Sequence, residues 1–496
     1  MLGTATLIAK EKPNILVFLV DDMGWQDTSV PFWSERTSLN DTYNTPNMER
    51  LAAIGTKFTQ AYACPVSSPS RISLMTGANV VQHKVSNWTL NKDQATDSPS
   101  EYLTFGGWNN NGMSSEPGIP STFYSKALPA LLSENGYLTG IIGKAHFGAI
   151  DTPAADPLNI GFDYNIAGHA AGAMGSYFGE QNYGNKEAGT WDKPWGVPSL
   201  ESYHGSNVFL TEALTLEGCK FMEKAVSDKK PFFLYMSHYA VHAPFVEDIR
   251  FYQRYIDMGL TEKEAQYASL IEGMDKSLGD LMDWVIDKGI AENTIIIFMS
   301  DNGGYTVGRG GEAAQRNYPL RGGKGSCFEG GVREPLIVYW PNVTKPQTEN
   351  STPVIIEDFF PTIIEMAGIS QYTVPQKVDG VSFVSALKEE NMDMERPLYF
   401  HYPNNWGERR EDVGIPQSAI RKGDWKFIYS HETGKRELFN LKNDISEKYN
   451  LINNDQYQQK AKELAKILSN YLRSNNATMP YYKDNGEKVP YPDYNN

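Results

Sequence analysis

The chain has little of several features that usually mark a protein's class. Its 496 residues include three cysteines (Cys64, Cys219 and Cys327), too few for a disulfide framework. No apolar run approaches the roughly 20 residues of a spanning helix, so we expect no membrane span. Its 45 basic residues stand against 60 acidic ones, a formal charge of −15. This balance argues against nucleic acid as a ligand, because a nucleic-acid backbone needs a basic surface.

The residues that are plentiful predict an α/β fold. The chain is 40% hydrophobic and 12% aromatic, enough for a sizeable core. Short apolar runs predict buried strands at residues 15–20, 138–142, 232–236, 295–299 and 336–339. Helical patterns lie between them at residues 45–55, 126–135, 207–224 and 265–289. Strands alternating with helices indicate a large, mostly parallel sheet sandwiched by helices.

The pattern changes near residue 375, where proline and polar residues cluster. Short strand candidates follow at 398–402, 418–421, 426–429 and 437–441, and one helical pattern closes the chain. We therefore predict a main domain over residues 13–375 and a smaller C-terminal α+β subdomain with a short antiparallel sheet over 376–496. We expect residues 1–12 to be either the remnant of a signal peptide or a disordered end.

Chemically active side chains follow four of the predicted strands. In an open parallel sheet, ligands bind outside the carboxyl ends of the strands. The residues at these ends are Asp21, Asp22, Lys144, His146, His238, His242, Asp301 and Asn302. They are expected to meet at one edge of the sheet.

The oxygen ligands among these residues predict a metal site. Asp21, Asp22, Asp301 and Asn302 offer hard oxygens and no thiolate, which favours Ca²⁺ or Mg²⁺ over zinc. Either pair alone is more simply explained as a cap or turn, but the two together, next to lysine and histidine, favour a metal. A zinc site on His238 and His242 is the weaker alternative, since Pro244 argues against a helix there.

One short motif makes the functional prediction specific. Ser67, Pro69 and Arg71 are followed by Leu74 and then by Thr76-Gly77. This motif resembles the signature of the formylglycine-dependent sulfatases, in the alkaline phosphatase-like superfamily. Similar blocks, in that family's order, occur at residues 14–22, 45–58, 136–148, 230–244, 300–303 and 322–333. Two positions depart from the family's usual pattern, Ala78 after the Thr-Gly and Ala145 between Lys144 and His146.

The resemblance implies a catalytic mechanism. Ser67 would be oxidised by a maturation enzyme to formylglycine, whose hydrate attacks sulfur with one hydroxyl and expels sulfate with the other. Residue 67 would share a Ca²⁺ (or Mg²⁺) with Asp21, Asp22, Asp301 and Asn302. The remaining catalytic roles would fall to Arg71 and Lys144, which neutralise the alkoxide, His146 as base, and His242 and Lys324, which bind the sulfate, with His242 as the acid for the leaving group.

Loop residues are the candidates for recognising the substrate. Aromatic, amide and cationic side chains suit sugar rings and hydroxyls, although any one of them could simply pack against a loop. The candidates are His83, Trp108, His238, Arg316, His401, Asn404, Asn405 and Trp406. We predict an exo-acting carbohydrate sulfatase that removes sulfate from a sulfated galactose or N-acetylhexosamine.

The serine at position 67 also suggests a source. In the family the serine form is matured by a bacterial enzyme, so we expect a bacterial protein that is periplasmic or secreted. Two alternatives stay open from the sequence. One is a phosphodiesterase or phosphonate hydrolase of the same superfamily. The other is a non-catalytic relative that binds sulfated glycans.

Overall fold

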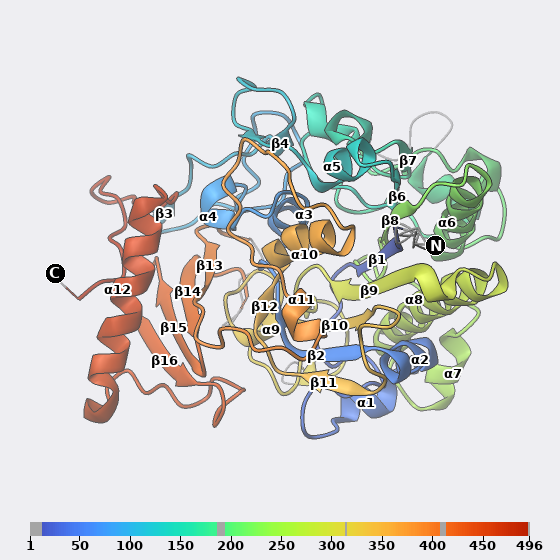
Figure 1. Cartoon of the computed structure of the whole chain (residues 1–496). Helices are drawn as coiled ribbons and strands as arrows, with labels where there is room; N and C mark the ends of the chain where they lie inside the picture. Colours follow the sequence, from blue (N-terminus) through green and yellow to red (C-terminus); the bar gives the residue numbers. More distant parts are fainter. Residues whose placement is uncertain (1–11, 186–193, 313–314, 407–412, 495–496) are drawn as a thin grey trace, which may run out of the picture.

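A large mixed sheet forms the centre of the molecule (Figure 1). The computed structural model describes residues 12–185, 194–312, 315–406 and 413–494, so almost all of the 1–12 segment lies outside it. The strands run in the order β11-β2-β10-β9-β1-β8-β6-β7, with β12 paired to β2. Their bounds are β1 (Asn14–Val20), β2 (Thr56–Tyr62), β6 (Leu138–Gly143), β7 (Tyr164–Ile166), β8 (Phe232–Ser237), β9 (Thr294–Ser300), β10 (Arg333–Tyr339), β11 (Thr348–Asn350) and β12 (Val354–Ile355).

The middle of this sheet is parallel, as predicted. β1 pairs in parallel with both β8 and β9, and β6 pairs in parallel with β8. β10 is antiparallel to its neighbours β9 and β2. The sequence reading did not identify β2, because its partly buried stretch with Lys57 and Gln60 lacks a continuous apolar run.

Helices cover both faces of the sheet, and the alternation of strand residues shows how. Ile15 and Val17 of β1 enter one hydrophobic cluster, while Leu16 and Phe18 enter the other. The first cluster includes residues of α3 (Ser67–Thr76), α5 (Leu128–Glu134) and α10 (Phe359–Met366). The second includes residues of α2 (Pro46–Ile54), α6 (Leu210–Ser227), α7 (Tyr252–Asp257) and α8 (Glu262–Asp287).

A separate antiparallel sheet lies in the C-terminal part, at the left of Figure 1. Its strands are β13 (Leu398–Tyr402), β14 (Gln417–Lys422), β15 (Trp425–Ser430) and β16 (Arg436–Asn440), hydrogen-bonded in chain order. Helix α12 (Gln458–Ser474) packs its apolar side on β14 and β15. The predicted fold class is therefore confirmed, and the division at residue 375 stays a prediction.

The smaller elements complete the fold. They are α1 (Ser38–Thr42), α4 (Val80–His83), α9 (Glu329–Val332), α11 (Val384–Leu387), β3 (Leu103–Thr104), β4 (Met113–Ser114), β5 (Phe123–Tyr124) and β17 (Tyr481–Tyr482). Across the described ranges, no helix combines the length and the apolar character that crossing a membrane requires.

A buried lysine joins the two sheets. Lys426 of β15 is fully buried and lies 2.8 Å from Glu329 and 3.0 Å from Glu447. Burial would raise the pKa of Glu329, but Lys426 and Arg333 hold it at about 2. The backbone N–H of Glu329 also donates to Glu447 at 2.7 Å. Because Glu329 begins α9 at the end of the loop that carries Lys324, this cluster attaches that loop to the C-terminal sheet.

Replacing Lys426 should therefore destabilise the protein strongly. Lys426→Met leaves two buried carboxylates without their shared cation, which should cost about 3–5 kcal/mol in the free energy of unfolding. Urea denaturation monitored by tryptophan fluorescence measures the loss. Lys442→Met, at an exposed lysine of the same subdomain, is the matched control and should change stability by less than about 0.5 kcal/mol. Equal effects of the two changes would contradict a structural role for the cluster.

Candidate active site

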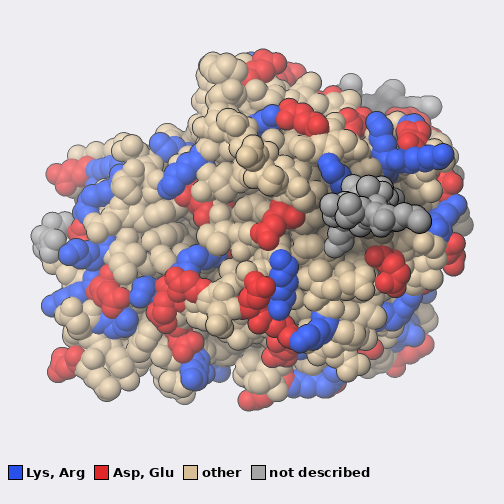
Figure 2. Space-filling model, in the orientation of Figure 1, with Lys and Arg blue, Asp and Glu red and all other residues tan. Residues whose placement is uncertain are grey.

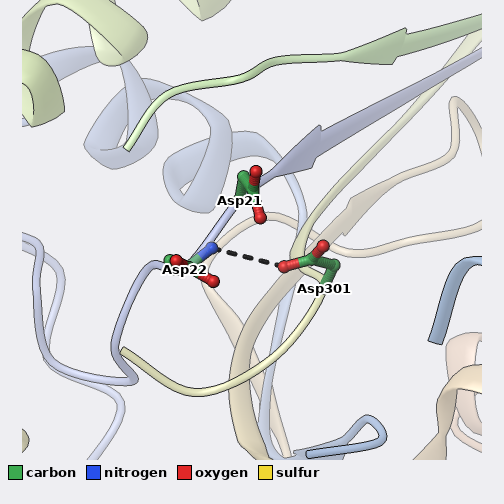
Figure 3. A group of neighbouring side chains, drawn as sticks. All are labelled: Asp21, Asp22 and Asp301. Atoms are coloured by element: carbon green, nitrogen blue, oxygen red, sulfur yellow. Dashed lines mark hydrogen bonds between the residues drawn. The ribbon is translucent and has the colours of Figure 1, made fainter. Parts of the chain in front are cut away.

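Two pairs of oxygen-bearing side chains meet at the carboxyl ends of neighbouring strands. Asp21 and Asp22 follow β1, Asp301 and Asn302 follow β9, and Val20 lies opposite Ser300 in the parallel register. Asp22 has a left-handed backbone, with φ +61°. Successive side chains of an extended strand point to opposite faces, so this turn allows Asp21 and Asp22 to approach one centre. Figure 3 shows Asp21 and Asp22 at the end of one strand, facing Asp301.

The three carboxylates are buried and close together. Each offers an oxygen that lies within 4.8 Å of the others. The backbone N–H of Asp22 donates to Asp301 Oδ1 at 3.3 Å, and Asn302 Nδ2 donates to Asp22 Oδ1 at 2.8 Å. The Asn302 amide oxygen is thereby turned toward Ser67.

Ser67 completes this cluster from the first turn of α3. Its Oγ lies 3.2 Å from Asp21 Oδ1 and 3.1 Å from Asn302 Oδ1, both of them acceptors. A hydroxyl has one proton, so it cannot donate to both oxygens. Ser67 Oγ thus lies next to an acceptor oxygen to which it does not donate, and a hard cation such as Ca²⁺ or Mg²⁺ fits this set of oxygen ligands.

The ionisation of the carboxylates supports the same conclusion. Burial, together with the nearby charges of Asp301 and Asp22, raises the pKa of Asp21 to about 7, although Lys144 lies 2.6 Å away. Burial would also raise the pKa of Asp22, but Lys324 at 2.7 Å and His242 hold it well below its usual range. The charge of a bound cation would favour the ionised form of all three carboxylates.

Arg71 stabilises the carboxylate cluster by pairing with Asp301. Its guanidinium is fully buried, with Nε 2.9 Å and Nη2 2.8 Å from Asp301 Oδ2. Nη1 donates to the carbonyl of Lys144 at 3.0 Å. Arg71 therefore ties α3 to the ends of β6 and β9, and its expected role in neutralising the alkoxide stays a prediction.

A cavity of about 190 Å³ opens beside Ser67. It brings together five residues predicted to be catalytic, which are Ser67, Lys144, His146, His242 and Lys324. Lys144 Nζ lies 3.1 Å from Ser67 Oγ. The rest of the lining is apolar and includes Trp88, Trp195 and Trp406. Cationic and imidazole groups on one side and indole rings on the other suit a sugar that carries an anionic group.

The position of His146 fixes which ring nitrogen can act as a base. Its Nε2 lies 2.9 Å from the carbonyl oxygen of Thr89, which can only accept a hydrogen bond, so Nε2 carries the hydrogen and donates. Nδ1 is buried and has no hydrogen-bond partner within the described residues. Burial and the nearby Lys144 and Arg71 lower the pKa of His146 well below its usual value, so the ring is neutral with its lone pair on Nδ1. A Cβ at Gly172 would lie 2.2 Å from Cε1 of this ring, so only glycine leaves room for it.

His242 lies at the opposite edge of the cluster. Its Nδ1 lies 2.6 Å from the carbonyl of Ala243, and its Nε2 lies 3.7 Å from Asp22 Oδ2. Burial and the nearby Lys324 ammonium lower the pKa of His242 to about 3. An anion bound between His242 and Lys324 would raise this pKa, because it offsets the lysine's charge.

Three histidines expected to bind substrate lie in the interior instead. The Nε2 atom of His238 is 2.9 Å from Ser277 Oγ, and that of His83 is 3.0 Å from Ser73 Oγ. Both ring nitrogens of His401 are bonded, to Ser418 and to the carbonyl of Thr478. Each is at most 1% exposed, which is at odds with the prediction that they contact substrate.

Three other residues predicted to recognise the substrate make hydrogen bonds within the protein. Asn404 Nδ2, the Asn405 backbone N–H and Trp108 Nε1 all donate to Asp97, at 2.9, 3.0 and 3.1 Å. These hydrogen bonds connect the segment of Asp97 and Trp108 to that of Asn404 and Asn405, and the side chains of Trp108, Asn404 and Asn405 are buried.

The two remaining members of that set have different positions. Trp406 lines the pocket, whereas Arg316 lines a second cavity. Trp195 and Gly172 also line the pocket, and the sequence reading missed both. They lie between recognisable motifs, so nothing local distinguishes them.

The family of the chain follows from comparison with known proteins. A family model described as "Sulfatase" matches residues 13–369. The chain belongs to the sulfatase family. A second model, "N-sulphoglucosamine sulphohydrolase, C-terminal", matches residues 323–474. The protein is thus a sulfuric ester hydrolase, as the motif around Ser67 predicted.

Individual relatives extend over nearly the whole sulfatase chain. A "Sulfatase" of Formosa agariphila is 32% identical, covering 98% of this chain and 93% of its own. The N-acetylgalactosamine-6-sulfatase of Mus musculus is 27% identical, covering 95% and 88%. Among solved structures, Ps i-CgsB in complex with k-i-k-neocarrahexaose is 28% identical, covers 94% of each chain and has a TM-score of 0.71.

The carboxylate cluster should make the sulfatase's stability depend on divalent cations. Adding Ca²⁺ at about 100 times its Kd to chelator-treated protein should add about 2.7 kcal/mol of stability. Differential scanning calorimetry measures this as a rise in Tm. The isosteric change Asp301→Asn should remove most of the rise, whereas Asp283→Asn at an exposed ion pair should keep it. A Ca²⁺-induced rise of the same size in Asp301→Asn would rule out this cluster as the binding site.

Proposed function

We propose that this sulfatase removes sulfate from the terminal sugar of a sulfated carbohydrate, using formylglycine made from Ser67 and a Ca²⁺ held by Asp21, Asp22, Asp301 and Asn302. The observation that carries the proposal is the position of Ser67. Its Oγ is within 3.2 Å of Asp21, Asn302 and Lys144, and the residue lines the pocket. Mg²⁺ is the second choice for the same oxygen donors.

Formylglycine and the cation would each supply a specific kind of chemistry. The formylglycine hydrate supplies a hydroxyl that attacks sulfur and a second hydroxyl whose deprotonation releases sulfate. The cation supplies positive charge that favours the ionised hydrate and the bound sulfate.

The chain's own residues would manage charge and protons around residue 67. Lys144, 3.1 Å from Ser67 Oγ, stabilises negative charge on the side chain at this position. Arg71 keeps Asp301 ionised and holds the start of α3 against the strand ends. His146, with its lone pair on Nδ1, accepts the proton of the second hydroxyl.

Lys324 and His242 would act on the substrate's sulfate ester. Both line the pocket, and both also approach Asp22, so they lie where the metal and the substrate would meet. Lys324 binds a sulfate oxygen. His242 gains a proton when the anion offsets the charge of Lys324, and it then protonates the departing sugar oxygen.

The pocket itself supports a terminal sugar as the substrate unit. Its volume of about 190 Å³ is below the roughly 300–1,000 Å³ of pockets for drug-sized ligands, which favours one sugar ring. Three tryptophans suit stacking against the C–H face of a pyranose. The names of the relatives, an N-acetylgalactosamine-6-sulfatase and a protein solved with a neocarrahexaose, favour a sulfated galactose or N-acetylhexosamine.

The alternative activity, that of a phosphodiesterase or phosphonate hydrolase, is not supported by the metal-binding side chains of the site. A two-zinc phosphodiesterase would need a second set of histidine and aspartate ligands. Within the described ranges, the side chains form one cluster of three such ligands, all of them aspartates. We further propose that the protein is bacterial and exported, and that a maturation enzyme acts on Ser67 before it folds, since α3 and its serine are buried in the folded chain.

Maturation of Ser67 can be tested by mass spectrometry. The tryptic peptide of residues 58–71, from protein co-expressed with a serine-type maturation enzyme, should be lighter than its serine form by two hydrogens, about 2 Da. Its aldehyde should react with a hydrazine, and the protein should release sulfate from sulfated galactose or N-acetylhexosamine.

Ser67→Ala is the control, which should show neither the aldehyde nor turnover. Unmodified serine in fully active protein would overturn the mechanism. Modified protein that binds sulfated sugars without turnover would favour the non-catalytic alternative.

The space beside His146 gives a second test. Gly172→Ala should push the imidazole off its position and lower kcat by about 100-fold, the lower range for loss of a general base, with a smaller effect on KM. Gly106→Ala, where an added Cβ meets nothing within 4 Å, is the matched control. Steady-state kinetics on matured enzyme measures both. Unchanged kcat in Gly172→Ala would contradict a catalytic role for His146.

A further inference from the structure

A second cavity lies beside the loop that carries Lys324. Its volume is about 920 Å³, against about 190 Å³ for the pocket at Ser67. One wall consists of Thr306 and residues 315–322, and the other comes from Lys435, β16 and the turn that follows it. We call it the C-terminal groove.

Positive charge predominates in the C-terminal groove. Arg316, Arg321, Lys435 and Lys448 line it, and Glu437 at the same surface pairs with two of them, Arg321 at 3.3 Å and Lys435 at 3.0 Å. The other acid in the lining, Glu447, is buried and faces Lys426. In the part of the chain that the structure describes, no carboxylate forms an ion pair with the exposed Lys448.

This local excess is opposite in sign to the net charge of the chain, which is formally −15. On the face shown in Figure 2, basic and acidic side chains are interspersed, without a broad field of one sign. Four cationic side chains that line one groove suit an anionic ligand.

The C-terminal groove and the pocket are lined by neighbouring residues of the connection between β9 and α9. Gly322 lines the groove, and Lys324, two residues later, lines the pocket. Near the start of the same connection, Thr306 lines the groove, while the ring of Tyr305 packs 5.7 Å from that of Trp406 at the pocket. The two cavities are therefore close to each other at both ends of this connection.

We propose that the C-terminal groove binds the neighbouring, negatively charged units of the carbohydrate whose terminal sugar occupies the pocket. This inference rests on the proposed function. The pocket holds one sugar unit, so a longer substrate must continue outside it. Lys435 and Lys448 attract the sulfate groups of those units. Arg316 uses Nε, Nη1 and Nη2 to donate to the carbonyls of Gly310, Thr306 and Gly311, so its role is to hold the groove wall in shape.

The test is a charge reversal in the groove. Lys435→Glu/Lys448→Glu changes two exposed side chains that lie outside the pocket, so folding and maturation should be unaffected. Lys442→Glu/Lys462→Glu makes the same change in charge elsewhere in the C-terminal part and is the matched control. Binding is measured by calorimetry on the Ser67→Ala protein carrying each pair of changes. The probes are sulfated hexasaccharides from carrageenan and from chondroitin sulfate, and the same sugars after desulfation.

We expect the groove variant to bind the preferred sulfated hexasaccharide about tenfold more weakly, and the control variant to bind it within twofold of the parent. Added salt should reduce the difference. In matured enzyme, kcat/KM on the hexasaccharide should fall by a similar factor, through KM. kcat/KM on a monosaccharide sulfate should stay within about twofold.

Two results would overturn the groove proposal. One is equal binding of the hexasaccharides by groove and control variants, and the other is an equal loss of kcat/KM on the monosaccharide sulfate. Failure of the proposed function looks different, because the parent enzyme would then hydrolyse no sulfated sugar at all. Groove-dependent binding would in that case support a sulfated-glycan-binding protein.

Discussion

The rest of the site depends on one electrostatic constraint, the burial of three carboxylates beside three cationic side chains. Asp21, Asp22 and Asp301 face Lys144, Lys324 and Arg71, and all six are at most 5% exposed. Their formal charges cancel, but burial, with a smaller contribution from the neighbouring carboxylates, raises the pKa of Asp21 to about 7. A bound divalent cation would favour the ionised carboxylates and give the site a net positive charge. Such a site would attract an anionic ester to the pocket even though the chain as a whole is acidic.

The fold provides this arrangement through neighbouring parallel strands. Because β1 pairs with both β8 and β9, their carboxyl ends bring Asp21, Asp301 and His242 to one edge without a long loop. Arg71 then crosses from α3 to the same edge and fixes the helix that begins with Ser67. Lys324 does not follow a strand of the sheet directly. It lies on the loop between β9 and α9, which contacts both the main sheet and the C-terminal sheet. The buried cluster of Lys426, Glu329 and Glu447 explains how the smaller sheet contributes to the site without supplying a reacting group.

The sequence predicted those parts of the molecule that local patterns encode. Buried parallel strands are continuous apolar runs, so β1, β6, β8, β9 and β10 were identified, and the residues after them could be assigned to one edge. Five of the six residues expected to be catalytic follow these strands or belong to the motif at Ser67, and the sixth, Lys324, lies in the block at residues 322–333. Strand β2 was not predicted, because its half-buried pattern of residues resembles that of a loop.

Substrate residues were harder to predict because a side chain's type does not reveal what it faces. A histidine or an asparagine after a strand can equally well hydrogen-bond to a sugar or to its own fold, and only tertiary contacts decide. The three histidines, His83, His238 and His401, are hydrogen-bonded to side chains in the core. Asn404 and Asn405 donate hydrogen bonds to Asp97. Trp195 reaches the pocket from a segment without a motif, so its role depends wholly on how that segment is placed. The positions of the loop residues around the pocket are therefore set by distant contacts, whereas the sheet itself sets the positions of Asp21, Lys144 and Asp301 at the strand ends.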